Sequence, residues 1–170
     1  MSILPYISII ISFGVFIAFL ASMIAISGIP ESFSDFYYRL EQKRKGAGWI
    51  FTITCWVIAL SMLPSWVACS GENIQFLAFL AAVGLCFVGG APQFKDIGLA
   101  RIVHFSGAIT WATATVLWLI FSSTWWCLLA APLFAIIALF NKKRWLFWLE
   151  MAVPIPIYSA LLLTIYLLSL

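Results

Sequence analysis

The chain has 170 residues, of which 65% are hydrophobic and 9% are charged, and its formal net charge is +3. An ordinary soluble domain carries about 25% charged residues, so this composition excludes a soluble fold. A membrane span needs about 20 apolar residues, and six such stretches follow one another here with short connectors. We therefore predict an all-α membrane protein, a single domain over residues 1–170 with six transmembrane helices.

The basic residues fall in three connectors only, which predicts how the helices are oriented. Lys and Arg accumulate on the cytoplasmic side of membranes, where anionic lipids also attract them. We expect these connectors in the cytoplasm, both termini outside it, and the protein in a bacterial inner membrane. Nucleic acid is not an expected partner, because no aromatic residues alternate with the basic runs for base stacking. The connectors hold Arg39, Lys43, Arg44 and Lys45, then Lys95 and Arg101, then Lys142, Lys143 and Arg144.

The first span is predicted over residues 3–28. Its apolar core has no Lys or Arg before it, whereas a cleavable signal peptide begins with a basic region. We therefore expect a retained helix. Gly28 and Pro30 end it, because glycine accepts a left-handed cap and proline cannot continue the backbone ladder.

A short amphipathic helix is predicted next, over residues 32–42. Its apolar face has the helical spacing i, i+3, i+4, i+7. Such a helix lies in the plane of the cytoplasmic interface, with its aromatic side chains among the lipid headgroups. On the other face, Asp35 and Arg39 have the i, i+4 spacing of an ion pair. The apolar face consists of Phe33, Phe36, Tyr37 and Leu40.

The remaining spans are predicted over residues 48–69, 74–90, 103–121, 125–140 and 145–168. The span at 103–121 is rich in small residues, which let neighbouring backbones approach closely, so we expect it at the centre of the bundle. The span at 125–140 is barely long enough to cross. In the last span, Pro154 and Pro156 remove backbone donors and leave carbonyl groups free.

The four cysteines show no C-x-x-C spacing, so neither a metal site nor another cofactor is expected. Cys69 and Cys127 both lie near the predicted outer face. A disulfide between them and two free thiols both fit that placement.

Six polar side chains are predicted at or near the cytoplasmic face. Glu150 is the most informative of them, because an ionisable group inside a span costs at least ~2 kcal/mol unless it is paired, hydrated or protonated. By depth, its expected partner is His104 or Arg101. A purely structural interpretation is also open, in which long basic side chains from residues 143–144 reach Glu150. The six candidate ligand-binding residues are Asp35, Arg39, Asp96, Arg101, His104 and Glu150.

These residues predict a polar pocket that opens to the cytoplasmic leaflet. It would bind or transport a lipid-like or small amphiphilic, anionic ligand. Arg101 and Arg39 would contact its headgroup, while Glu150 and His104 would form hydrogen bonds or exchange a proton.

Two alternatives remain open. In a lipid-modifying enzyme, one metal ion on His104, Asp96 and Glu150, with or without Asp35, would activate water. A catalytic zinc site typically has three protein ligands, and this sequence offers only one histidine and widely spaced carboxylates as candidate ligands. The third interpretation is a structural subunit that forms a homo-oligomer or packs on a membrane-protein partner through its small-residue span.

Three short patterns carry a resemblance to known families. They are Ser-x-Ser-x-x-Tyr-Tyr over residues 32–38, Trp49 at the start of the second span, and Arg101-x-x-His104-x-x-Gly107-Ala108 at the start of the fourth. In these the chain resembles bacterial six-helix integral membrane families of unknown function and, more distantly, the damage-regulated autophagy modulator type. Proteins of that type are drawn with the first connector outside, whereas the basic residues here predict it inside. The resemblance implies six helices and no defined reaction.

Overall fold

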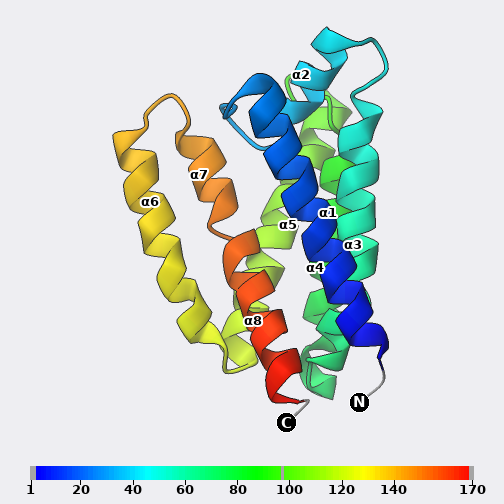
Figure 1. Cartoon of the computed structure of the whole chain (residues 1–170), viewed down its shortest axis with the longest axis vertical. Coiled ribbons are helices and arrows are strands. Elements are labelled where there is room, and N and C mark those ends of the chain that lie inside the picture. Colours follow the sequence, from blue (N-terminus) through cyan, green and yellow to red (C-terminus); the bar gives the residue numbers. More distant parts are fainter. Residues whose placement is uncertain (1–2, 97, 169–170) are drawn as a thin grey trace.

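The computed structural model describes residues 3–96 and 98–168, and every regular element in these ranges is helical. The predicted all-α class is therefore confirmed (Figure 1). The elements are α1 (Leu4–Ser27), α2 (Asp35–Lys43), α3 (Trp49–Ala68), η1 (Glu72–Ile74), α4 (Gln75–Gly90), α5 (Leu99–Phe121), η2 (Trp125–Ala130), α6 (Ala131–Phe140), α7 (Trp145–Met151) and α8 (Pro154–Leu167).

Within the described ranges, five segments are long and apolar enough to cross a membrane, which indicates a membrane protein. The segment predicted as a further span, Trp125–Phe140, is shorter and consists of the 3-10 turn η2 followed by α6. The five longer segments are Leu4–Ser27, Trp49–Ala68, Glu72–Gly90, Leu99–Phe121 and Trp145–Leu167.

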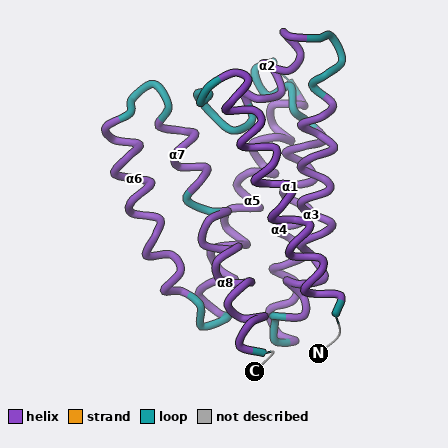
Figure 2. The backbone as a smooth tube through the Cα atoms, viewed as in Figure 1, coloured by secondary structure: helices purple, strands orange, loops and turns teal. Residues whose placement is uncertain are grey.

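The last of these segments is broken between α7 and α8, where Figure 2 shows a short loop. Pro154 stands at the start of α8 and has no N–H to give to the carbonyl of Glu150, and its ring crowds that carbonyl. The predicted effect of the proline is thus seen as a complete interruption. It places Glu150 in the last turn of α7, directly before the break.

The basic connectors gather at one end of the molecule. Figure 1 shows the first and last helices beginning and ending at the opposite end from α2 and the α6–α7 turn. The α4–α5 connector belongs to the same end as α2, because the backbone N–H of Lys95 donates a hydrogen bond to the Tyr38 hydroxyl over 2.8 Å. The clustering that the sequence predicted is therefore present in the fold.

Small residues let α4 and α5 pack with their backbones almost in contact. A Cβ atom on Gly84 would lie 2.6 Å from the backbone nitrogen of Trp111 and 2.7 Å from the carbonyl oxygen of Gly107. The expectation that α5 is the central helix is nevertheless wrong. Half of the α3 span is buried, against 33% for α5, because the small residues bring only one neighbour close to α5.

The apolar face of α2 packs on protein, which differs from the expected insertion among lipid headgroups. Phe36 is fully buried, and its ring lies 5.7 Å from those of both Phe19 and Phe33. Within this nine-residue helix Phe36 and Leu40 are buried, while Tyr37 is half-buried. The gain in apolar contact explains why α2 docks on the end of the bundle.

The prediction of an ion pair between Asp35 and Arg39 is also wrong, because each of these side chains binds another partner. Arg39 donates hydrogen bonds to the carbonyls of Ser27 and Gly28 at the end of α1. Lys43 donates to the neighbouring carbonyl of Ile26 over 3.0 Å. The last carbonyls of a helix have no partner within it and carry partial negative charge, so two cations satisfy them here.

Candidate functional site

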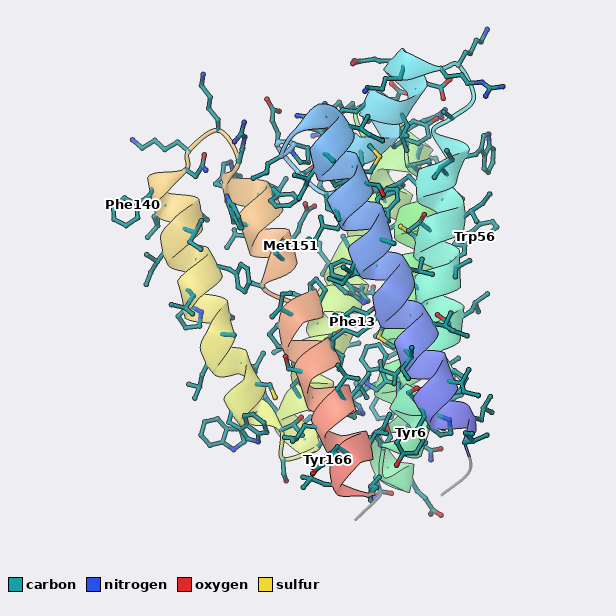
Figure 3. The ribbon with its side chains drawn as sticks, in the orientation of Figure 1. Tyr6, Phe13, Trp56, Phe140, Met151 and Tyr166 are labelled. Atoms are coloured by element: carbon teal, nitrogen blue, oxygen red, sulfur yellow. The ribbon has the colours of Figure 1, made fainter. Side chains whose placement is uncertain are left out.

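A cavity of about 300 Å³ lies between the broken segment α7–α8 and the group formed by α1, α3, α4 and α5. Its lining is mainly apolar, which differs from the polar pocket expected from the sequence. Figure 3 shows Met151, one of the lining residues, on the side of α7 that faces the rest of the bundle. The polar side chains in the lining include Glu150, His104, Tyr158 and Ser34.

Glu150 lines the cavity from the last turn of α7, and one of its carboxylate oxygens accepts a hydrogen bond. The backbone N–H of Phe33 donates a hydrogen bond to its Oε2. A second bond joins the same two segments, from the N–H of Phe147 to the carbonyl of Glu31 over 3.0 Å. The connector between α1 and α2 is therefore bonded to α7, and its residues Phe33 and Ser34 line the cavity.

None of the partners predicted for the Glu150 carboxylate is used. Among residues 3–96 and 98–168 the one ion pair joins Lys95 to Asp35, so Glu150 makes none with Arg101, with His104 or with the basic residues at 143–144. Its carboxylate therefore lies in a mainly apolar lining with a backbone amide as its hydrogen-bond donor.

His104 is buried, and its position is set by the end of α4. Its Nδ1 lies 3.0 Å from the carbonyl oxygen of Ala91 and 3.2 Å from that of Val88. Carbonyls only accept, so Nδ1 carries the proton and donates to them. The ring also stacks on Phe94, with the ring centres 4.8 Å apart. In the neutral imidazole the other nitrogen, Nε2, is then an acceptor.

The other four predicted residues do not line the cavity. Asp35 is buried beside it and binds Lys95, whose Nζ lies 2.7 Å from Oδ1. Arg39 binds the end of α1. Asp96 is exposed in the α4–α5 connector, and the exposed guanidinium of Arg101 lies over the ring of Phe105, 5.8 Å from its centre.

The donor set for a metal ion is likewise not assembled. In the part of the chain that the structure describes, no three His, Cys, Asp or Glu side chains come close enough to bind one ion. All four cysteines in that part are free thiols.

Sequence reasoning missed Tyr158 as part of this site. Its hydroxyl forms a 2.8 Å hydrogen bond with that of Ser12 on α1, and Ser12 donates to the carbonyl of Ile58 over 3.1 Å. A tyrosine and a serine in the middle of apolar spans were the available signal, because polar groups at that depth need partners. The bond holds α8 against α1 at the inner wall of the cavity.

The cavity reaches the surface between α5 and α7. Three of its lining residues are large, apolar and well exposed: Phe105 at 42%, Ile109 at 66% and Leu149 at 38% of their surface. The opening is therefore on the side of the helical bundle and has an apolar rim.

Comparisons of this chain with protein-family models, with curated proteins and with solved structures find no match.

Proposed function

We propose that this chain is an integral membrane protein that binds or moves a lipid-like or small amphiphilic ligand. The observation that carries the proposal is the side-opening cavity with an apolar lining and one carboxylate outside any ion pair. Ligand pockets in proteins are typically apolar, begin near 300 Å³ in volume, and contain a few polar groups that orient the ligand. Glu150 and His104 are those groups here.

The side opening suits a ligand that arrives from within the membrane. Its rim residues lie on spans whose exposed surfaces face lipid, so a hydrocarbon chain would enter without crossing water. Glu150 and His104 lie toward the end of the bundle that carries the basic connectors. By the distribution of Lys and Arg, that end is cytoplasmic and both termini are extracytoplasmic, as in a bacterial inner membrane protein.

The proposal includes a sixth crossing by η2 and α6. The ordinary rises of a 3-10 helix and an α-helix make the combined segment about 27 Å long, close to the hydrocarbon thickness of about 30 Å. Figure 1 shows α6 running alongside α7 at the edge of the bundle, and η2 contacts α8. In that arrangement α2 lies at the cytoplasmic interface, and the number of crossings is that of the six-helix families that the short sequence patterns resemble.

The experiment is native mass spectrometry of the protein released gently from detergent. We expect a bound lipid or amphiphile in the wild type. It should be lost in Ala112→Trp, which fills the cavity from α5, and retained in Thr113→Trp, which adds the same ring on the exposed side of the same helix. Retention of the same mass in both variants would refute the proposal, as would a wild type that neither carries nor takes up any amphiphile.

A further inference from the structure

We propose that the cavity selects a single-chain amphiphile whose polar end is a protonated amine, and that Glu150 binds the ammonium group. This inference rests on the proposed function and deepens it by naming the headgroup. An anionic headgroup, expected from the sequence because Arg101 and Arg39 were placed at the pocket, is the contrary outcome of the test below.

The charges around the cavity favour a cation. The lining contains no Lys or Arg within the described part of the chain. Arg39 donates hydrogen bonds to the carbonyls at the end of α1, and the guanidinium of Arg101 lies over the ring of Phe105. An anionic head would therefore meet the carboxylate of Glu150 with no basic side chain in the lining to offset the repulsion.

Glu150 has capacity for a further donor. A carboxylate offers about four acceptor positions on two oxygens, and the N–H of Phe33 uses one of them, on Oε2. A carboxylate in an apolar surrounding is costly unless it is paired, and an ammonium group supplies a charge-assisted bond that pairs it. The ligand would thus complete a site that the chain leaves open.

His104 points to the same kind of head. Its Nδ1 proton is committed to the carbonyls of Val88 and Ala91, so the neutral ring offers only the lone pair of Nε2 to a ligand. Glu150 and His104 therefore both accept hydrogen bonds, and the hydroxyl of Ser34, also in the lining, can accept as well as donate. A head that donates several hydrogen bonds fits Glu150 and His104, whereas a carboxylate head can accept none from these two groups.

The walls and the size suit one hydrocarbon chain. Met62, Ile157, Ala112 and Trp111 are among the apolar lining residues, and the volume of about 300 Å³ lies at the lower end for ligand pockets. A single alkyl tail would fill this space and make van der Waals contacts with the apolar side chains that line it.

The test compares three ligands that share one tail and differ in charge: dodecylamine, dodecanol and dodecanoate. Binding is measured at pH 7 by native mass spectrometry and tryptophan fluorescence, with the protein in phosphatidylcholine nanodiscs and empty nanodiscs as the background. We expect the amine to bind at least about tenfold more tightly than the other two, as one charge-assisted hydrogen bond allows. Glu150→Gln should remove that preference, so that dodecylamine and dodecanol bind the variant with similar affinity.

Glu150→Asp is the matched variant, because it keeps the charge and should keep the preference for the amine. If all three ligands bind the wild type equally, or the carboxylate binds best, the headgroup inference is wrong while the proposed function stands. If the amine binds Glu150→Gln as tightly as wild type, Glu150 is not its partner. If no ligand binds above the empty nanodisc and the Ala112→Trp level, both proposals fail.

Discussion

The backbone N–H of Phe33 donates a hydrogen bond to Oε2 of Glu150, which joins the connector after α1 to the last turn of α7 across 117 positions in the sequence. Glu150, the one carboxyl group inside a predicted span, therefore lines the cavity and also links two segments of the chain through a hydrogen bond. A change at this position should act on the local structure at Phe33 as well as on ligand selection.

Glu150→Leu removes the acceptor and leaves the Phe33 N–H without one. A hydrogen bond to a charged group contributes about 1.5–3 kcal/mol, so amide exchange at Phe33 should quicken by about tenfold or more. Glu150→Gln keeps an amide oxygen and should show a smaller increase. Hydrogen exchange followed by mass spectrometry of peptides that span residues 29–35 measures this. Unchanged exchange in Glu150→Leu would show that the bond does not protect the connector.

The ion pair between Asp35 and Lys95 should contribute modestly to stability. Asp35 is 8% exposed at its side chain but Lys95 is 51% exposed, so water and salt screen the pair. We expect a coupling free energy of roughly 1 kcal/mol in a double-mutant cycle of Asp35→Asn and Lys95→Gln, measured by thermal or denaturant unfolding in detergent. The coupling should shrink at high salt. Additive effects of the two substitutions would contradict a stabilising pair.

Gly84→Ala should separate α4 from α5. The new Cβ would lie 2.6 Å from a backbone atom of Trp111, which cannot move without shifting the helix. Overpacking of this kind costs about 1–3 kcal/mol in the free energy of unfolding.

Gly14→Ala is the control for this substitution, because Gly14 is exposed on α1 and no atom beyond the adjacent residues and backbone of its own helix lies within 4 Å of the added Cβ. Its protein should be as stable as wild type or up to ~1 kcal/mol more stable, since alanine is the better helix former. Unfolding followed by circular dichroism compares the two. Equal melting temperatures for both variants would mean that the close approach of α4 and α5 is not needed.

The connector between α2 and α3 should open in acid. The carboxylate of Glu41 accepts hydrogen bonds from the N–H of Gly46 over 2.8 Å and of Gly48 over 3.1 Å, and these bonds lower the pKa of Glu41. Because the folded pKa is the lower one, their contribution is complete above the unfolded value of about 4.3 and is lost as the pH falls through the folded pKa.

Protection of the Gly46 and Gly48 amides, corrected for intrinsic exchange, should therefore be constant near neutral pH and fall below about pH 4. In Glu41→Gln the amide oxygen does not titrate, so protection should be weaker and should not change with pH in this range. A wild-type profile that matches Glu41→Gln would show that the Glu41 carboxylate does not close this connector.

How far the site could be predicted is seen in His104 and Glu150. Their depth in apolar segments marked both as unusual, and both line the same cavity. Their hydrogen-bonding partners were predicted wrongly, because the sequence suggested only side chains of suitable charge at a similar depth in the membrane. The structure instead uses backbone groups: the carbonyls of Val88 and Ala91 for His104, and the N–H of Phe33 for Glu150. Every residue carries such groups, so composition and spacing do not reveal which one is near.

The sequence by itself determined the all-α membrane class, the positions of most helix ends and the gathering of the basic connectors at one end. Hydropathy and charge act over consecutive residues, and proline and glycine act on their own backbone, so these features are local. The tertiary structure decided that α2 packs on the bundle, that Arg39 binds the end of α1, that α3 is more buried than α5, and that a cavity remains beside α7. Each depends on side chains from segments far apart in the sequence meeting in space, where packing and the need of buried polar groups for partners select one arrangement.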